Sequence, residues 1–239
     1  MIERVLLKTI EMAIRTVHEH PDCDSWFNAG YKDSGVYKIT FNGKQRDVYC
    51  NMNDVKNEGW TVILKRINGS VDFNQNWSGY KAGFGQSESE YWFGNDDIHA
   101  LTSIVGKTVY LKISATTFEG QSTTVVYKGF KVENEANKYK LHTGVFQSGN
   151  SAHSNDFLDH DGMFFSAPDV DNDVRDIHCA ENRGAGFWFK YCHMIFPTAP
   201  YHSNQVDCPL RRGIYWTSFK GENYCLKTIE MAIRITSEE

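Results

Sequence analysis

The chain has 239 residues, of which 41% are hydrophobic, 23% are charged and 14% are aromatic. This composition is typical of one large globular domain or two small ones, and it excludes a disordered chain, which would be poor in aromatic residues. The formal net charge of −5 excludes a general electrostatic attraction to nucleic acid, and no apolar run approaches the roughly 20 residues of a membrane span.

The chain opens on one half of an internal repeat. The nine letters LKTIEMAIR occupy residues 7–15 and again residues 226–234. Around the first copy, Leu6, Ile10, Ala13 and Val17 follow the 4-3-4 spacing of a short amphipathic helix. In the second copy apolar and polar residues alternate, which is typical of a half-buried strand. A duplication during gene assembly, a stalk remnant and a strand that competes with its carboxy-terminal twin all remain open.

The segment after Pro21 is rich in strand patterns. The predicted strands are, in chain order, Gly35–Thr40, Arg46–Met52, Trp60–Arg66, Thr108–Ser114 and Thr123–Asn134. Asn42-Gly43 lies between the first two strands and is a strong signal for a tight hairpin turn. Two short helices are predicted, at Trp77–Ala82 and at Asn95–Thr102, the second with Asp96 or Asp97 as its cap. Periodicity then fades from about Leu141 to Glu222, and a loop of that length is either functional or held by bridges and ions.

Six cysteines favour three disulfides and an oxidising compartment, although six cysteines permit fifteen pairings. A zinc site is disfavoured because the chain has no CxxC pair and Cys192 and His193 are adjacent. Charged residues interrupt Met1–Arg15, so this stretch does not have the pattern of a signal peptide. We therefore expect a mature segment of a secreted protein.

Several motifs in the chain resemble the fibrinogen C-terminal, or fibrinogen-related, domain, whose members include ficolins, tachylectins, angiopoietins, tenascins and the fibrinogen chains. The motifs are GWTVILKR, VDFNQNWSGYKAGFG, EYWFGNDDIHALT, FSAPDVDNDVRDIHCAENRGAGFWFKYCH and YCLKTIEMAIR. They occur in the family's order between about Asp22 and Ile235. The resemblance implies an α+β fold with a central twisted, mainly antiparallel sheet, short helices and a loop-rich subdomain that binds calcium and ligand.

The resemblance also implies a division of the chain. Residues 1–20 would be an extension or short stalk, 21–235 the fibrinogen-related domain and 236–239 a tail. Within the domain, 21–61 would form an amino-terminal subdomain, 62–140 with 224–235 the central sheet, and 141–223 the calcium and ligand subdomain. The implied bridges are Cys23–Cys50 and Cys179–Cys192. Cys208 and Cys225 fall outside the family pattern, and we predict that they pair with each other, two free thiols being the alternative.

The acidic run before Cys179 is a candidate calcium site. Asp169, Asp171 and Asp173 alternate along the chain, and hard oxygen donors with this spacing can converge on Ca²⁺ when the backbone loops around them. An EF-hand is excluded, because the loop lacks the required Gly and has Ala180 and Asn182 where a Glu would stand. By resemblance, Asp171 and Asp173 are the carboxylate ligands. Backbone carbonyls near Arg175 and Ile177 complete the shell, with Asp169 behind it. A solvated acidic loop is the alternative.

In the family, ligands bind beside the second bridge, where a cis peptide, here Tyr191–Cys192, turns the N–H groups of Cys192 and His193 toward the ligand. This sequence changes the walls of that pocket. Arg183 replaces the family's Tyr or Asp, Leu210-Arg211-Arg212 replaces a Tyr, and Tyr201 is retained. We expect a basic rim of Arg183, Lys190, His193, Arg211 and Arg212 that prefers anionic ligands. The alternative is that these cations pair with nearby Asp and Glu.

The predicted function is that of a secreted, calcium-dependent recognition module of innate immunity. As a lectin it would bind acetylated or anionic glycans, or glycoproteins, on cell or microbial surfaces, and homo-oligomers are possible. The alternative is a protein- or receptor-binding module without sugar binding. An enzyme is disfavoured, because HExxH, GxSxG and Walker motifs are missing from the sequence. Asn68 and Asn76 begin glycosylation sequons. We expect Phe187 or Trp188 to be able to contact ligand. The aromatic residues assigned to the core are Trp60, Trp77, Tyr80, Phe84, Trp92, Trp188 and Trp216.

Overall fold

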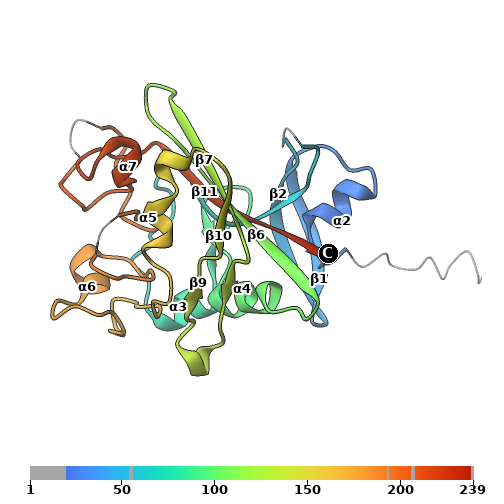
Figure 1. Ribbon diagram of the computed structural model, residues 1–239, viewed down its shortest axis with the longest axis horizontal. Coiled ribbons are helices and arrows are strands. Elements are labelled where there is room, and N and C mark those ends of the chain that lie inside the picture. Colours follow the sequence, from blue (N-terminus) through green and yellow to red (C-terminus); the bar gives the residue numbers. More distant parts are fainter. Residues whose placement is uncertain (1–19, 54–55, 193, 206–207, 238–239) are drawn as a thin grey trace, which may run out of the picture.

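The computed structural model describes residues 20–53, 56–192, 194–205 and 208–237. Its centre is an antiparallel sheet with the strand order β1-β2-β3-β11-β6-β7-β10, onto which the short strands β4 and β5 are added beside β3. Short helices and long loops gather at the end of the sheet opposite β1 and β2 (Figure 1). The described part of the chain is therefore an α+β domain with a mainly antiparallel sheet, as the sequence predicts.

The strands have the following bounds: β1 Gly35–Phe41, β2 Lys44–Asn51, β3 Trp60–Arg66, β4 Phe84–Gly85, β5 Tyr91–Trp92, β6 Lys107–Thr116, β7 Ser122–Lys128, β8 Lys131–Val132, β9 Leu141–His142, β10 Val145–Gly149 and β11 Thr228–Ser237. The α-helices are α2 Cys23–Asn28, α3 Trp77–Ala82, α4 Asn95–Thr102, α5 Asn155–Leu158, α6 Cys179–Arg183 and α7 Thr217–Lys220. Two single turns of 3₁₀ helix lie at Glu135–Asn137 and Ser151–His153. The predicted strand at Trp60–Arg66 and both predicted helices are confirmed.

The hairpin of β1 and β2 forms around the predicted turn. Phe41 pairs with Lys44, which leaves Asn42 and Gly43 as the two turn residues. Both have positive φ, 49° and 70°. That backbone matches the twist of the flanking strands and favours Asn and Gly. Because the side-chain period of a strand is two, this turn fixes which residues of β1 and β2 face the core.

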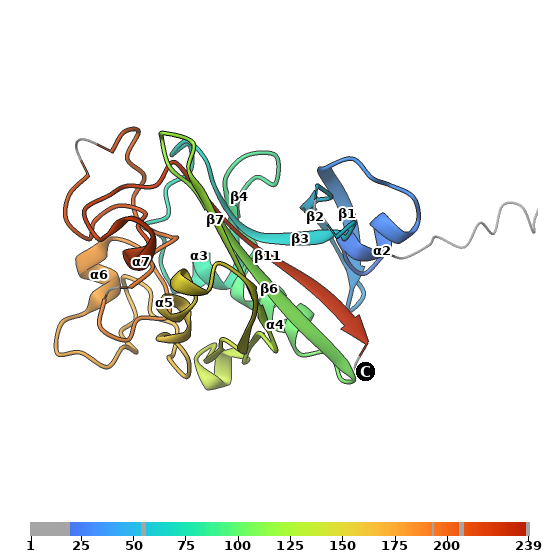
Figure 2. The ribbon, with the colours of Figure 1, turned by 45° about the horizontal axis from the view of Figure 1, so that its top comes forward.

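The last strand of the chain is a central strand of the sheet. β11 lies between β3 and β6 and is antiparallel to both (Figure 2). Ile229, Met231 and Ile233 are buried, and the more exposed Thr228, Glu230 and Arg234 alternate with them as the second repeat copy predicts. Ala232 departs from this pattern, because it is also fully buried, next to a shift in the register with β3. The first copy, with its predicted helical stripe, lies outside the described residues.

Two expectations about local structure are wrong. The predicted strand Thr123–Asn134 is two strands, because the chain bends at Gly129, where φ is +90°, and β8 joins β9 in a second sheet. Neither predicted aspartate caps α4, whose N-cap residue is Gly94. Asp96 instead accepts a hydrogen bond from the Tyr139 hydroxyl, and Asp97 forms ion pairs with Lys44 and Arg46.

The aromatic residues form a continuous core between the sheet and the loop-rich end. Tyr80, Trp92, Trp188 and Trp216 are fully buried and pack against neighbouring rings. Trp60 is also buried, whereas Trp77 and Phe84, which the sequence assigns to the core, lie only partly buried at its edge.

A buried arginine joins the two ends of the domain. Arg66, the last residue of β3, donates from Nη1 to the carbonyl oxygens of Ala199 (2.6 Å) and Pro197 (3.2 Å). Its Nε lies 3.7 Å from Glu90 Oε1, and both side chains are inaccessible to solvent. The two carbonyls and the nearby carboxylate offset the cost of burying this charge, because an unpaired buried charge is strongly destabilising. The loops that carry the candidate site are thus connected directly to the central sheet.

Three disulfides close the loops of the described chain: Cys23–Cys50, Cys179–Cys192 and Cys208–Cys225. The first two are the pairs that the family resemblance implies, and the third is the pair predicted outside it. Cys208–Cys225 attaches the loop before α7 to the short segment that leads into β11. The six cysteines contain no free thiol.

Candidate functional site

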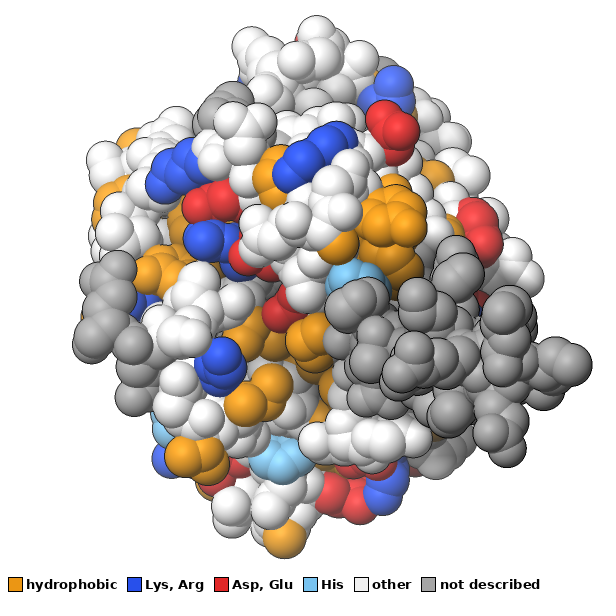
Figure 3. Space-filling model, turned by 90° about the vertical axis from the view of Figure 1, so that its right-hand side faces the viewer, with side chains coloured by type: hydrophobic (Ala, Val, Ile, Leu, Met, Phe, Trp, Pro, Cys, Tyr) orange, Lys and Arg blue, Asp and Glu red, His pale blue; other side chains and the backbone are white. Residues whose placement is uncertain are grey.

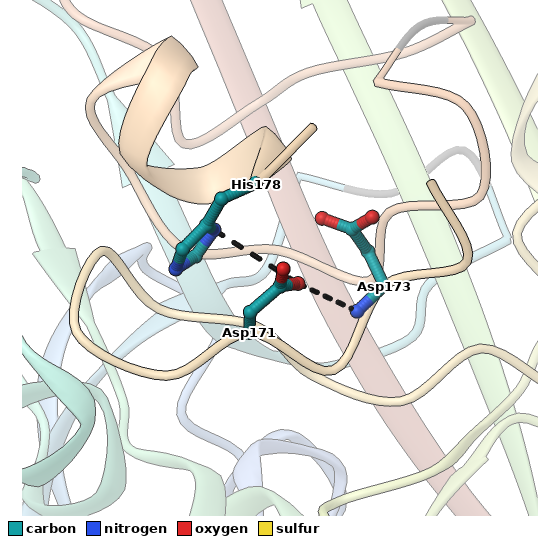
Figure 4. A group of neighbouring side chains, drawn as sticks. All are labelled: Asp171, Asp173 and His178. Carbon is teal, nitrogen blue, oxygen red and sulfur yellow. Dashed lines mark hydrogen bonds and ion pairs between the residues drawn. The ribbon is translucent and has the colours of Figure 1, made fainter. Parts of the chain in front are cut away.

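Two carboxylates and an imidazole converge on the loop before α6. One ligand atom from each of Asp171, Asp173 and His178 lies within 4.8 Å of the others (Figure 4). Asp171 Oδ1 accepts a hydrogen bond from the Asp173 N–H at 3.1 Å and lies 4.0 Å from His178 Nδ1. The turn made by these residues is the convergence that the alternating aspartates predict.

Asp173 holds this loop in shape through backbone hydrogen bonds. Its Oδ1 accepts from the N–H of Arg175 and its Oδ2 from the N–H of Cys179, each at 2.8 Å. Cys179 is the first residue of α6, so Asp173 ties the acidic loop to a helix that is itself anchored by the Cys179–Cys192 bridge. His178 is the N-cap of α6 and accepts from the N–H of Glu181.

The charges of the loop favour a cation. Burial raises the pKa of Asp173, and the neighbouring Asp171 raises it further, while the hydrogen bonds from Cys179 and Arg175 lower it. A cation between the two carboxylates would remove this repulsion. Their oxygens are the hard ligands that Ca²⁺ prefers. The His178 nitrogen is a softer donor and already accepts from the helix N–H, so the donor set that fits calcium is Asp171 and Asp173.

Other predicted members of the acidic site lie apart from this pair or act differently. Asp169 Oδ1 accepts from the Trp77 N–H at 2.7 Å, so this carboxylate is bound to the first residue of α3. The Arg175 side chain donates to the Tyr191 carbonyl at 3.3 Å, and the Ile177 side chain is 52% exposed. His178, which sequence reasoning did not single out, is signalled only by its position immediately before Cys179.

The predicted cis peptide is wrong. The described residues contain no cis peptide bond, and the Tyr191–Cys192 bond is trans. The chain turns here through the left-handed conformation of Cys192, whose φ is +59°. The Cys192 carbonyl accepts from the Tyr215 hydroxyl at 3.2 Å. The Tyr191 side chain is 48% exposed, and the predicted ligand residue His193 lies outside the described residues.

A shallow depression of about 390 Å³ lies next to the carboxylate pair. Val174, Arg175, Asp176 and Tyr191 line it. The Val174 side chain is 57% exposed and, like Ile177, is unusually accessible for an aliphatic residue. Two larger depressions, of about 680 and 700 Å³, involve none of the residues of this loop.

The end of the molecule near the carboxyl terminus of β11 is also hollowed, with hydrophobic and charged side chains mixed around the hollow (Figure 3).

Comparison with known proteins connects this arrangement to a family. The family model of the fibrinogen beta and gamma chains, C-terminal globular domain, matches residues 19–236. The chain belongs to the fibrinogen C-terminal domain family. Fibrinogen-like protein 1 of Bos taurus is 39% identical over 229 residues, which are 90% of this chain and 72% of that protein. Ryncolin-4 of Cerberus rynchops is 36% identical, over 91% of this chain and 62% of its own.

Solved structures show the same fibrinogen-like globe fold. The fibrinogen-like globe domain of human ANGPTL6 has a TM-score of 0.84 and 31% identity, and the match covers 90% of this chain and 95% of that one. Lamprey fibrin D-dimer, complexed with the peptide ligand Gly-His-Arg-Pro-amide, has a TM-score of 0.78 and 28% identity over 97% of this chain and 82% of its own. Among the described residues, no helix is both long and apolar enough to cross a bilayer.

The basic rim expected of this fibrinogen-like domain is largely neutralised within the structure. Arg211 forms an ion pair with Glu222, with Nη2 and Oε2 2.5 Å apart, and Lys190 pairs with Asp159 at 2.9 Å. The Arg183 side chain donates to the Arg211 carbonyl at 3.0 Å, and burial lowers the pKa of Arg183. These contacts match the alternative that the rim cations satisfy local partners. Leu210 and Arg212 remain exposed.

Three further residues expected at the ligand pocket lie within the hydrophobic core or pack against it. Phe187 and Trp188 are fully buried, so the expectation that either contacts ligand is wrong. The Tyr201 hydroxyl lies 3.0 Å from the carbonyl oxygens of both Ile67 and Lys227. Its ring packs closely over Gly69, where an added Cβ would approach within 2.9 Å. Tyr201 thus joins the loop-rich end to the loop after β3.

Both sequon asparagines of the domain are exposed. Asn68 Oδ1 accepts from the Ser70 N–H, and Asn76 Oδ1 caps α3 by accepting from the Gly79 N–H. In each case the bond uses the side-chain oxygen, whereas glycan attachment uses the nitrogen. The second sequon therefore combines an exposed acceptor with a structural role at the start of α3.

Proposed function

We propose that this domain is an extracellular, calcium-dependent recognition module that binds a protein partner through the loop before α6. The observation that carries the proposal is the depression lined by exposed Val174 and Tyr191, in the loop that also contains the Asp171–Asp173 pair and exposed Ile177. Exposed aliphatic and aromatic side chains that gather around a depression mark interaction surfaces. Partner binding and ion binding then use the same short loop.

In this proposal Asp171 and Asp173 bind Ca²⁺, and the backbone carbonyls of Arg175 and Ile177 complete the shell with water. The ion neutralises two adjacent carboxylates and draws the loop around itself. Val174 lies between Asp173 and Arg175, so ordering of the ligands also orders one wall of the depression. Calcium therefore prepares the binding surface and takes no part in a chemical reaction.

A protein partner is favoured over a glycan because most cations of the basic rim are already paired within the chain. Arg183, Lys190 and Arg211 already hold partners within the chain, so an anionic sugar would have to compete with Asp159 and Glu222. Val174, Ile177 and Tyr191 instead add exposed apolar surface to this loop region, beside the exposed Arg175 and Asp176. The complex of lamprey fibrin with a peptide ligand supports peptide recognition by this fold.

A second candidate, binding of an anionic glycan, rests on Arg175. This guanidinium lines the depression with Tyr191, and no described carboxylate lies within ion-pair distance of it. An arginine beside an exposed ring can hold a sugar carboxylate or sulfate in two hydrogen bonds. On this reading the domain is a lectin for acidic glycans on cell or microbial surfaces.

Secretion and glycosylation at Asn68 and Asn76 belong to the same proposal. The three disulfides fit a chain that folds in an oxidising compartment. The exposed sequons fit a chain that passes through a glycosylating secretory pathway.

The test compares two ligand classes with and without the ion. The full chain is screened against cell-surface ectodomains and against a glycan array, each in Ca²⁺ and in EDTA. We expect saturable binding to an ectodomain that EDTA abolishes and that Val174→Asp weakens at least tenfold. Val105→Asp is the matched control, because Val105 is 96% exposed and lies between α4 and β6. Binding to acidic glycans alone, lost in Arg175→Ala, would instead establish the second candidate.

A further inference from the structure

Two segments of this chain carry the sequence that forms the central strand β11. Residues 226–234 form most of β11, and residues 7–15 repeat them without a single change. The repeated letters include those that the structure buries: Ile229, Met231, Ala232 and Ile233 are all at most 1% exposed. The first copy therefore contains the side chains that fill this position in the core.

The two strands that flank β11 would stay in the sheet if β11 left it. β3 pairs with β11 from Thr61 to Arg66, and β6 pairs with it from Lys107 to Thr116. β11 is the last strand in the chain, so it can leave the sheet without pulling another strand with it. Departure would stop at Cys225, which the bond to Cys208 holds in place.

The direction of the chain also suits an exchange within one molecule. β11 ends close to α2, because Arg234 forms an ion pair with Asp24, with Nε and Oδ1 3.4 Å apart. The first copy ends at Arg15, and the nine residues from there to Asp24 can span up to roughly 30 Å. If Arg15 took the place of Arg234, the first copy would run through the sheet in the same direction as β11.

We propose that residues 7–15 of the same chain can replace residues 226–234 between β3 and β6. The two occupants differ only outside the nine shared letters. Ile235, which is 9% exposed, corresponds to Thr16, and Cys225 corresponds to Leu6. The extra apolar contact of Ile235 biases the position toward β11. Exchange releases a carboxy-terminal segment that stays attached to the domain through Cys208–Cys225.

The experiment weakens one copy at a time in the full chain. Ile233→Asp places a charge in the buried centre of β11, and Ile14→Asp makes the same change in the first copy. We expect Ile14→Asp to leave the melting temperature unchanged and Ile233→Asp to remain folded at a reduced melting temperature. The double variant should unfold. Ile63→Asp, in β3, is the control without a duplicate and should unfold whichever first copy is present.

Hydrogen exchange identifies the occupant directly. In Ile233→Asp, amides of residues 7–15 should gain protection and those of 228–237 should lose it, in a chain that remains monomeric at all concentrations. The milder pair Ile233→Ala and Ile14→Ala covers the case in which the aspartate prevents folding. The proposal would be overturned if the decreases in melting temperature of the two single variants simply add in the double variant, for both the aspartate and the alanine pair. Absence of protection at residues 7–15 would also overturn it. A dimer formed by Ile233→Asp would also overturn it, because the strand would then come from a second copy.

Discussion

At the scale of single residues, the proposed calcium site rests on two carboxylates with different surroundings. Asp173 accepts two backbone hydrogen bonds and is partly buried, whereas Asp171 is exposed and accepts one from Asp173. Asp171→Asn should therefore remove one negative ligand of the ion and disturb the folded loop less than the same change at Asp173. We expect the affinity for Ca²⁺, measured by titration calorimetry, to fall at least tenfold while the melting temperature without calcium stays within a few degrees of the parent value.

Asp169→Asn is the matched control for that titration. Asp169 has the same residue type and lies two positions away, but its carboxylate accepts from the Trp77 N–H. The amide oxygen of Asn can still accept this bond, so we expect a calcium affinity equal to that of the parent chain. Equal losses in Asp169→Asn and Asp171→Asn would contradict the assignment of the ion to the Asp171–Asp173 pair.

A second prediction at this scale concerns buried Glu90. Burial opposes its charge, but the N–H groups of residues 67–69 and the nearby Arg66 outweigh burial and lower the pKa of Glu90. A lowered folded-state pKa contributes stability above the unfolded value near 4.5 and loses it as the pH falls through the folded value. Glu90→Gln should cost roughly 3–5 kcal/mol at pH 7. In urea unfolding, the gap to the parent should narrow below pH 4.

Glu88 serves as the control for the pH series, because it is exposed and only two residues away. Glu88→Gln should leave the unfolding free energy at pH 7 and its pH profile unchanged. A constant gap between Glu90→Gln and the parent across the acid range would show that the carboxylate charge contributes nothing to the stability of the buried pair.

At the scale of elements, local signals predict structure wherever one segment decides its own conformation. The hairpin at Asn42-Gly43, β3, α3 and β11 follow from turn chemistry and periodicity alone. The break between β7 and β8 does not, because it depends on Gly129 and on pairing with β9, which comes later in the chain. Asp97 has the residue type of a cap, but its ion pairs with Lys44 and Arg46 come from a distant hairpin.

The site shows the same division. Alternating aspartates predict a convergent acidic loop, and the structure forms it with Asp171 and Asp173. The pairing of the rim cations could not be predicted from the sequence, because it depends on how the loops fold together. Arg211 meets Glu222 and Lys190 meets Asp159 only in the folded domain. Residue type predicted the charge of these side chains, but tertiary contacts decided that the charge would be satisfied within the chain.

The Cys208–Cys225 bridge supplies a prediction for one element, the loop before β11. The bond spans 17 residues and restricts the unfolded chain, which should stabilise the fold by about 3 kcal/mol. Replacing both cysteines by Ser should lower the melting temperature by roughly 6–12 °C in scanning calorimetry. Calcium affinity should be retained, because the acidic loop is anchored by Cys179–Cys192. An unchanged melting temperature would show that packing alone holds this loop.

At the scale of the whole molecule, the domain consists of a hydrogen-bonded sheet and a loop-rich region that is held together mainly by side chains and disulfides. The sheet is held by continuous antiparallel pairing from β1 to β10, whereas the region from Asn150 to Glu222 is held by side-chain packing, two disulfides, Arg66, Tyr201 and the proposed ion. Loops with few backbone ladders open at lower free energy than core strands. A partner that binds this end therefore meets a surface whose order is set by a small number of contacts.

This dependence predicts that calcium stabilises the entire domain when the loops and the sheet unfold together. A ligand that binds only the folded state at a concentration 100-fold above its dissociation constant adds about 2.7 kcal/mol, which corresponds to a rise in melting temperature of roughly 5–10 °C at this chain length. Scanning calorimetry in EDTA and in Ca²⁺ should show this rise in the parent chain and in Asp169→Asn, but not in Asp171→Asn. Mg²⁺ should give a smaller rise, because it demands near-ideal octahedral geometry and gives up its water ligands reluctantly. Equal rises with both ions, or a rise retained in Asp171→Asn, would place the stabilising cation elsewhere on the domain.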